Sequence, residues 1–284
     1  VRGFIVREYS QLPSNWKCQQ DLDAYLKQAG IMAMCGIDTR MLTKRLRNHG
    51  TLRGRLCLAP PTEEDFAQIR RIRIDHPVQQ VTCQAAYALP GQGKRVAVLD
   101  FGLKKSILTS LQARGCALRV FPAFTKAAEV LAWNPDGIML TNGPGDPKDN
   151  GSIIEEVKKL IGQRPIFGIC LGHQLMALAN GADTEKLKYG HRGAKLKFGH
   201  HGCNHPVKDL SSGRVCITSQ NHGYTVSAAS LKDNMRISHV NWNDQTIEGL
   251  VYTDHPSFTV QFHPEAAPGP QDTAYLFDRF VAMM

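Results

Sequence analysis

Cys170 is the residue whose surroundings point most directly to chemistry, because it lies in the stretch Gly168-Ile-Cys-Leu-Gly172 between a strand-like and a helix-like run. A nucleophile elbow needs small residues two positions before and two after the nucleophile, since strand and helix approach closely there. At a helix N-terminus, the dipole and free N–H groups favour the thiolate, which is the attacking species. The N–H of Leu171 would be an oxyanion-hole donor. The alternative is a buried, inert cysteine.

A second candidate group is formed by His263 and Glu265, which lie two residues apart in Thr259-Val-Gln-Phe-His-Pro-Glu265. Residues i and i+2 of a strand face the same side, so the imidazole and the carboxylate are expected to project together. Pro264 places the pair at a strand end or edge. With Cys170, the pair suits a nucleophilic triad in which a carboxylate orients the base. A surface salt bridge is the alternative if the pair is taken without the cysteine.

A glycine-rich loop, Thr141-Asn-Gly-Pro-Gly-Asp-Pro147, directly follows a predicted strand. Gly143 and Gly145 leave backbone N–H groups accessible, which could bind an anion or complete an oxyanion hole. The Lys-Ser/Thr ending of a nucleotide-binding P-loop is missing. A plain turn remains the alternative.

The cluster His200-His-Gly-Cys-Asn-His205 suggests zinc, but zinc sites draw ligands from well-separated pairs and no second pair is present. We therefore predict no metal site. The other cysteines lack an activating context and are predicted to be packing residues: Cys18, Cys35, Cys57, Cys83, Cys116, Cys203 and Cys216.

The elements that must position these groups alternate between strand and helix after residue 94, which is typical of parallel βαβ units with helices on both faces of the sheet. Strands are expected over 95–101, 117–121, 137–141 and 165–169, and helices over 104–114, 127–132, 153–161 and 171–179. The sequence is richer in strand patterns from about residue 184, and a last helix is expected over 273–283. These patterns predict an α/β fold.

Two domains are predicted. Residues 1–86 form a smaller front domain that mixes a strand with three helical stretches, and residues 95–284 form the α/β domain. Between them, Tyr87-Ala-Leu-Pro-Gly-Gln-Gly-Lys94 has the proline and glycine content of a linker. Because the first residue is valine, we expect a fragment or a processed chain, and hence an N-terminally incomplete front domain.

The composition is that of an ordinary globular protein, with 284 residues, 42% hydrophobic residues and 21% charged residues. No apolar run approaches the roughly 20 residues that span a bilayer, and no signal peptide is evident. Eight scattered cysteines without framework spacing indicate a reducing cytoplasm. Secreted, membrane and fibrous classes are therefore excluded.

The net charge of +9 is spread over both predicted domains. Its densest cluster lies in one helical stretch and the residues after it: Arg40, Lys44, Arg45, Arg47, Arg53 and Arg55. No aromatic residues interleave with these cations, so we predict a solvated helix face or a docking surface rather than a nucleic-acid site.

Two consecutive segments, Lys186–Ala194 and Lys195–Cys203, repeat the pattern Lys-Leu-Lys-Tyr/Phe-Gly-His. Two copies are too few for a solenoid. We predict a local tandem duplication within a surface hairpin.

Taken together, these residues resemble the class I, or triad, glutamine amidotransferases, and within them the family of carbamoyl-phosphate synthase small chains. The resemblance covers almost the whole chain. Its stretches are Gly36-Ile-Asp-Thr-Arg40, Leu99-Asp-Phe-Gly102, Asn142-Gly-Pro-Gly-Asp-Pro147, Phe167-Gly-Ile-Cys-Leu-Gly-His-Gln174, Ser219-Gln-Asn-His-Gly223, Gln261-Phe-His-Pro-Glu265 and Pro268-Gly-Pro270. It implies a flavodoxin-like amidotransferase domain behind the front domain.

The resemblance also implies the reaction. Cys170 would attack the carboxamide of glutamine, His263 would shuttle protons and Glu265 would orient it. Hydrolysis of the γ-glutamyl thioester would then release glutamate and ammonia. The family's glutamine-binding residues correspond here to Gly143, Gly145, Leu171, Gln174, Asn221, Gly223 and Tyr224, the last standing where the family often has Phe.

By the same resemblance, the ammonia passes through a tunnel to a large chain, which uses ATP, magnesium and bicarbonate to make carbamoyl phosphate for arginine and pyrimidines. No cofactor is then expected in this chain, and its partners are the large chain and glutamine, with no nucleic acid and no membrane. The family has a further N-terminal segment that contributes a serine to glutamine binding, a single copy of the repeated nine residues and a glycine at Cys203. The alternatives are a thiol peptidase with the same triad and a truncated docking chain that is catalytically impaired.

Overall fold

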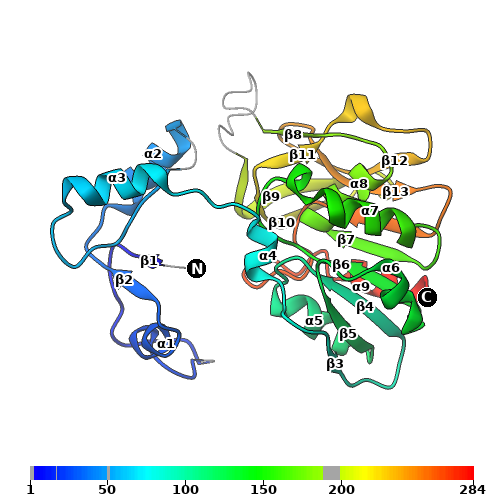
Figure 1. Cartoon of the computed structure of the whole chain (residues 1–284), viewed down its shortest axis with the longest axis horizontal. Coiled ribbons are helices and arrows are strands. Elements are labelled where there is room, and N and C mark those ends of the chain that lie inside the picture. The colour runs from blue at the N-terminus through cyan, green and yellow to red at the C-terminus, as the bar shows by residue number, and fades with distance from the viewer. Residues whose placement is uncertain (1–2, 17, 50–51, 188–198) are drawn as a thin grey trace. The chain divides into compact units, whose positions relative to one another are not determined.

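The chain divides into two units, Val1–Ile74 and Asp75–Met284, in a computed structural model that describes residues 3–16, 18–49, 52–187 and 199–284 (Figure 1). In its described residues, the smaller unit pairs two short parallel strands and carries three helices. Their bounds are β1 (Gly3–Ile5), α1 (Leu22–Gln28), β2 (Met32–Met34), α2 (Thr39–His49) and α3 (Glu63–Arg71).

Side-chain caps explain where these helices begin. The Asp21 carboxylate accepts the Ala24 N–H at 2.7 Å before α1. Thr62 and Asp65 form a reciprocal capping box at the start of α3. Such caps satisfy backbone donors that have no partner inside the helix.

The larger unit is built on a ten-stranded sheet with the order β10-β9-β12-β13-β14-β7-β6-β4-β5-β3. Its strands are β3 (Tyr87–Leu89), β4 (Arg95–Asp100), β5 (Ala117–Pro122), β6 (Gly137–Leu140), β7 (Ile166–Ile169), β9 (His200–Asp209), β10 (Val215–His222), β12 (Met235–Asn241), β13 (Ile247–Tyr252) and β14 (Ser257–Val260). A small second sheet pairs β8 (Thr184–Lys186) with β11 (Tyr224–Val226).

Five neighbouring strands, β5-β4-β6-β7-β14, are parallel. Numbered along the chain, their order is 2-1-3-4-5, which is the flavodoxin-like arrangement. In such sheets ligands bind outside the carboxyl ends of the strands. The predicted α/β class is therefore confirmed, and the loops after β4, β6, β7 and β14 are where a site is expected.

Helices cover both faces of this sheet (Figure 1). Ala97 and Leu99 of β4 pack in the cluster that contains residues of α6, α7 and α8, while Val96 and Val98 pack in the cluster of α5 and α9. This period of two is what a strand buried on both sides requires. The helices are α4 (Pro77–Val81), α5 (Lys105–Gln112), α6 (Ala127–Ala132), α7 (Gly151–Leu160), α8 (Leu171–Ala179) and α9 (Tyr275–Ala282), with short 3₁₀ turns at Pro147–Asn150 and Ala228–Ser230.

The region expected to be the linker differs from the prediction. Tyr87–Leu89 forms the edge strand β3 beside β5, and the two units divide after Ile74. The physical reason is local packing: Val78 is buried, and the Thr82 hydroxyl accepts the Ala123 N–H at 2.8 Å. These contacts tie the segment to the larger unit.

The predicted duplication falls largely on residues 188–198, which lie outside the described part of the chain. Every helix that the structure describes is too short or too polar to cross a lipid bilayer.

Candidate active site

Cys170 lies at the turn between β7 and α8, where its backbone has φ 53° and ψ −103°. A left-handed φ is costly for a residue with a side chain, about 1–3 kcal/mol, and such strain is typical of functional turns. A Cβ on Gly172 would lie 2.2 Å from the Leu140 oxygen, and one on Gly168 would lie 2.9 Å from the Gly172 carbonyl oxygen. The glycines thus permit the close approach of strand and helix that a nucleophile elbow requires.

His263 and Glu265 lie just beyond the end of β14, on the same edge of the sheet as Cys170. The His263 Nδ1 donates to the Glu265 carboxylate at 2.7 Å, which leaves Nε2 for the hydrogen bond with the Cys170 side chain. The His263 backbone N–H donates to the Ser219 oxygen at 2.9 Å. The two residues meet through a turn after the strand rather than along the strand as predicted, because β14 already ends at Val260 and Pro264 and Glu265 lie in a turn.

The electrostatics of this group favour an ion pair. Burial by itself lowers the pKa of His263, but hydrogen bonds and negative charge from Cys170 and Glu265 outweigh it and raise the pKa to about 10. Burial would raise the pKa of Glu265, whereas His263 and Lys104 hold it below its ordinary value. The Lys104 Nζ lies 3.2 Å from the Glu265 Oε1. The imidazole is therefore held as a cation between a sulfur and a fixed carboxylate.

Lys104 is a member of the site that the sequence patterns do not identify. It also donates to the Ala266 carbonyl, and its backbone N–H donates to the Asn142 Oδ1 at 3.0 Å. Its ion pair with Glu265 joins two segments that are far apart in the sequence of the larger unit. The only local signal is its position two residues after the Leu99-Asp-Phe-Gly102 stretch at the carboxyl end of β4.

The glycine-rich loop after β6 packs against the elbow. A Cβ on Gly143 would lie 2.3 Å from the Phe101 oxygen and 2.7 Å from the Leu171 side chain. Gly145 has a φ of 98°, which favours glycine. The predicted residues Gly143 and Leu171 therefore come together beside Cys170.

The remaining predicted glutamine-binding residues are Gln174 in α8 and three residues at and after the end of β10: Asn221, Gly223 and Tyr224. The Gln174 Nε2 donates to the Tyr224 carbonyl at 2.9 Å. The Tyr224 hydroxyl hydrogen-bonds with Asp146, and burial and that carboxylate raise the Tyr224 pKa to about 12. Gly223 is the neighbour of Tyr224, and Asn221 Oδ1 accepts from His201 Nδ1 at 2.6 Å. Hydrogen bonds thus connect Gln174 of α8 with Tyr224, and Tyr224 with Asp146 in the loop after β6.

One buried group has ligand atoms close enough for a metal ion in the part of the chain described here: His200, His222 and Glu248, within 4.8 Å of one another. Both ring nitrogens of His200 already hydrogen-bond to carboxylates, those of Asp244 and Glu248. Cys203, from the cluster considered for zinc, instead lies 3.6 Å from the Ser219 hydroxyl. The cluster is satisfied by its own hydrogen bonds, and we assign it no ion.

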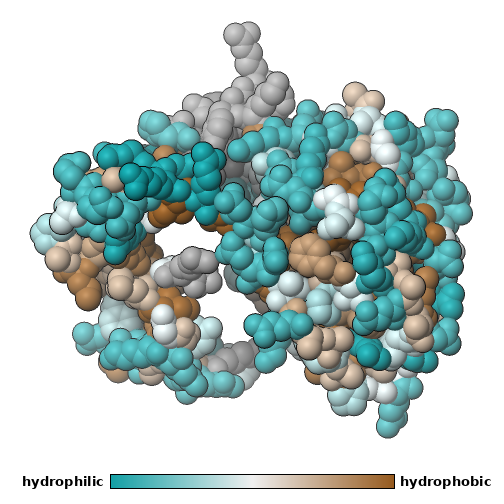
Figure 2. Space-filling view, viewed as in Figure 1, coloured by the Kyte–Doolittle hydropathy of each residue, from teal (hydrophilic) through white to brown (hydrophobic). Residues whose placement is uncertain are grey.

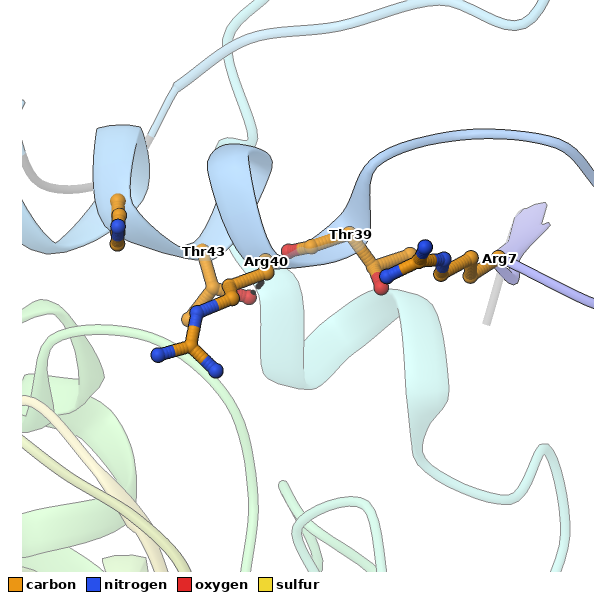
Figure 3. Close-up of a pocket in the computed structure, with 5 residues that line it drawn as sticks. Arg7, Thr39, Arg40 and Thr43 are labelled. Atoms are coloured by element: carbon orange, nitrogen blue, oxygen red, sulfur yellow. Dashed lines mark hydrogen bonds between the residues drawn. The ribbon is translucent and has the colours of Figure 1, made fainter.

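The smaller unit contains a basic hollow with a volume of about 460 Å³. Figure 3 shows Thr39, Arg40 and Thr43 on the first turns of α2 and Arg7 after β1. Lys44 also lines it. Its described lining residues include no cysteine, histidine or carboxylate, so it is suited to bind negative charge rather than to catalyse acyl transfer.

Comparison with known families matches residues 97–283 to the family described as "Glutamine amidotransferase class-I". Residues 1–56 match the family described as "Carbamoyl-phosphate synthase small chain, CPSase domain". The two matches cover the beginning of the smaller unit and nearly all of the larger unit's sheet.

Individual relatives agree with these matches. A carbamoyl phosphate synthase small chain from Listeria monocytogenes serotype 4b (strain F2365) is 50% identical over all of this chain and 77% of its own length. A carbamoyl phosphate synthase pyrimidine-specific small chain from Bacillus subtilis (strain 168) is 50% identical over all of this chain and 76% of its own length. A solved structure from Thermoplasma acidophilum, described as part of a putative GMP synthase, has a TM-score of 0.57 at 23% identity, over 68% of this chain and 94% of that one. The last supports the fold.

Proposed function

Since this chain belongs to the carbamoyl phosphate synthase small chains and carries their class I glutamine amidotransferase domain, we propose that Cys170, His263 and Glu265 are the residues that hydrolyse glutamine. The observation that supports this most is the strained elbow of Cys170, which hydrogen-bonds an imidazole that a buried carboxylate orients. This is the arrangement of a cysteine triad.

In the proposed mechanism, the Cys170 sulfur attacks the carboxamide carbon of glutamine. The backbone N–H of Leu171, the first of α8, has no partner inside its helix and stabilises the oxyanion of the tetrahedral intermediate. His263 carries the sulfur's proton and donates it to the leaving nitrogen, so that ammonia departs and a γ-glutamyl thioester remains. Water, deprotonated by His263, then attacks the thioester and releases glutamate and the thiol.

Glutamine is proposed to lie between the loop after β6 and the end of β10. Gly143, Gly145 and Leu171 line one side, while the other side is formed by residues that hydrogen bonds and the small sheet hold: Gln174, Asn221, Gly223 and Tyr224. The pocket orients the carboxamide toward the sulfur, which supplies proximity and orientation.

The proposed partner is the carbamoyl phosphate synthase large chain, which uses ATP, magnesium and bicarbonate, whereas this chain is proposed to need no cofactor of its own. Direct transfer of ammonia between the chains keeps it unprotonated and nucleophilic. No nucleic-acid partner is proposed. The eight free cysteines support a reducing cytoplasm.

The test is glutamate release from glutamine by the parent and by Cys170→Ser, with and without the large chain. We expect a loss of ~10⁴-fold or more in the variant, because the nucleophile is removed. Carbamoyl phosphate synthesis from added ammonium should persist. Cys203→Ser, a matched substitution of a half-buried cysteine near Ser219, should keep the parent rate.

Two results would contradict the proposal. Glutamate release by Cys170→Ser at the parent rate would remove Cys170 from the mechanism. A parent chain that binds the large chain but releases no glutamate would leave only the docking role.

A further inference from the structure

A buried histidine outside the triad is held between two carboxylates. His200, in β9, is 1% exposed; its Nε2 lies 2.8 Å from Asp244 Oδ2 and its Nδ1 lies 3.0 Å from Glu248 Oε1. Each ring nitrogen faces a carboxylate oxygen, an arrangement that favours a protonated, cationic ring. Burial raises the pKa of Glu248, and the hydrogen bond and charge of His200 oppose that rise. Burial alone would lower the His200 pKa, but the two hydrogen bonds and charges raise it to about 10.

This arrangement links three chain segments. His200 belongs to β9, Asp244 to the turn after β12, and Glu248 to β13. The Asp244 carboxylate also accepts from the Thr246 hydroxyl at 2.7 Å, which fixes the turn. A charge-assisted pair of this kind is costly to break on one side only, because the group left behind is buried and unpaired.

Hydrogen bonds continue from this cluster to the glutamine-binding segment. Gln220 Nε2 donates to Glu248 Oε2 at 3.1 Å, and Gln220 Oε1 lies 3.0 Å from His222 Nε2. His222 Nδ1 lies 2.8 Å from the Tyr224 carbonyl, the same oxygen that accepts from Gln174. The chain of contacts therefore runs from the buried cation to the residues proposed to hold glutamine.

The backbone follows the same route. In the β9–β10 ladder, His200 is the partner of His222 and His201 is the partner of Asn221. The Gln261 backbone N–H donates to the Glu248 carbonyl at 2.9 Å. A substitution of His200 would therefore first displace β10, the strand that carries Asn221.

We propose that His200, clamped by Asp244 and Glu248, is a positioning residue that sets the glutamine-binding conformation of Gln220–Tyr224. The inference rests on the proposed function and extends it to residues that do not touch the substrate. The cluster acts on glutamine affinity, whereas the reactivity of the Cys170 sulfur is set by its own turn and by His263. Loss of the clamp therefore raises KM for glutamine and leaves the reactivity of the Cys170 thiol unchanged.

The experiment uses the complex with the large chain and compares the parent with His200→Gln, Asp244→Asn and His255→Gln. His200→Gln keeps one amide donor but removes the charge and the second donor. Asp244→Asn keeps the shape of the side chain but removes its negative charge, which weakens the hydrogen bond to His200 Nε2. His255→Gln is the matched control, because His255 is a buried histidine of the same unit that hydrogen-bonds Ser257 instead.

Four quantities are measured for each variant: KM for glutamine, kcat for glutamine, synthesis from ammonium, and the rate of Cys170 alkylation by iodoacetamide. We expect KM to rise about tenfold in His200→Gln and about threefold in Asp244→Asn, with kcat within about threefold. Alkylation and ammonium-dependent synthesis should match the parent, and His255→Gln should leave all values unchanged. A merely structural defect would lower kcat and alkylation together with the fraction folded.

Unchanged KM in folded His200→Gln and Asp244→Asn would overturn the inference, as would slower alkylation at an unchanged KM. Stoichiometric metal in the parent that His200→Gln loses would replace it with an ion site. If His200→Gln does not fold, the Asp244→Asn result decides. A parent without glutaminase activity would overturn the proposed function and this inference together, whereas an unchanged KM overturns this inference alone.

Discussion

The two units of the chain place their hydrophobic residues very differently. In the described part of Val1–Ile74, Leu26 is the only buried residue, whereas Asp75–Met284 contains two extensive buried clusters. The smaller unit exposes large apolar side chains instead, several of them strongly: Leu12, Trp16, Leu58 and Ile74 are 85%, 87%, 97% and 73% exposed. Figure 2 shows hydrophobic colour on the surface of this unit.

This difference in burial makes the larger unit suited to catalysis and the smaller unit suited to contact with another surface. A buried ion pair such as His263 and Glu265 needs a low-dielectric interior that excludes water, and only the larger unit provides one among the described residues. Exposed apolar side chains and clustered basic groups, such as those around Arg40, suit contact with another surface. We therefore expect substitutions in the larger unit to affect stability and turnover, and substitutions in the smaller unit to affect association.

The largest contrast is expected from one glycine in each unit. In Gly172→Ala the new Cβ would meet the Leu140 oxygen at 2.2 Å, so α8 must move away from β6 and carry Cys170 with it. We expect a stability loss of about 3 kcal/mol, at the upper end for overpacking, and loss of glutamine hydrolysis. Denaturant unfolding and the glutaminase assay measure the two effects.

The control is Gly54→Ala in the smaller unit, where no atom lies within 4 Å of the added Cβ and φ is not left-handed. This substitution should change the free energy of unfolding by no more than about 0.5 kcal/mol. Equal effects of the two substitutions would show that the elbow adjusts as freely as an exposed loop. That result would contradict the difference in packing between the two units.

Local patterns predicted the parts of this contrast that depend on neighbours in sequence. The elbow around Cys170 was predictable because strand, turn and helix requirements all fall within a few residues. The alternating strands and helices from β4 to α8 followed from hydrophobic periodicity. The edge strand β3 was missed, since its proline and glycine neighbours indicate a linker and its pairing with β5 is a long-range contact.

Distant polar contacts were outside the reach of the sequence. Lys104 and Glu265 form an ion pair although most of the larger unit's sequence lies between them, and no periodic pattern marks such a pair. His200 was noticed only as a member of a histidine-rich run, while its partners Asp244 and Glu248 come from a turn and a strand further on. Burial gives these contacts their strength, and burial depends on the assembled sheet.

A smaller contrast is expected on acidification. Burial lowers the pKa of His173 to about 3 and, as the largest of several influences, that of His239 to about 4. As pH falls below 6.5, the unfolded chain gains protons on these rings and the folded unit does not, so stability falls by up to about 1.4 kcal/mol per pH unit for each ring. His200 and His263, whose pKa values are raised, are protonated in both states below pH 6.5 and their contribution is constant there.

Hydrogen exchange read by mass spectrometry at pH 7, 6 and 5 measures this slope for each unit separately. The His239→Gln variant should show a shallower slope in peptides of the larger unit. His49→Gln, which changes an exposed histidine of α2, should leave the slope as it is. An unaltered slope in His239→Gln would mean that this ring gains its proton in the folded state too.

The smallest effect is expected at the basic hollow of the smaller unit (Figure 3). Among the described residues no carboxylate pairs with Arg40 or Lys44, whereas the exposed Lys27 pairs with Asp23 at 2.6 Å. Replacing Arg40 and Lys44 by Gln should leave stability within about 0.5 kcal/mol and glutaminase activity unchanged. Association with the large chain should weaken by about 0.5–1 kcal/mol per charge, and more at low salt, because exposed charges chiefly set the encounter rate.

Titration of the large chain at two salt concentrations measures this difference, with Lys27→Gln as the matched loss of an exposed cation outside the hollow. Lys27→Gln should bind as the parent does, since its charge is already neutralised within the chain. A variant without Arg40 and Lys44 that binds normally but hydrolyses glutamine poorly would reverse the assignment of contact to one unit and chemistry to the other. Weaker binding at an unchanged basal rate would instead place part of the docking surface on α2, where Arg40 and Lys44, without a carboxylate partner among the described residues, are available to a negatively charged neighbour.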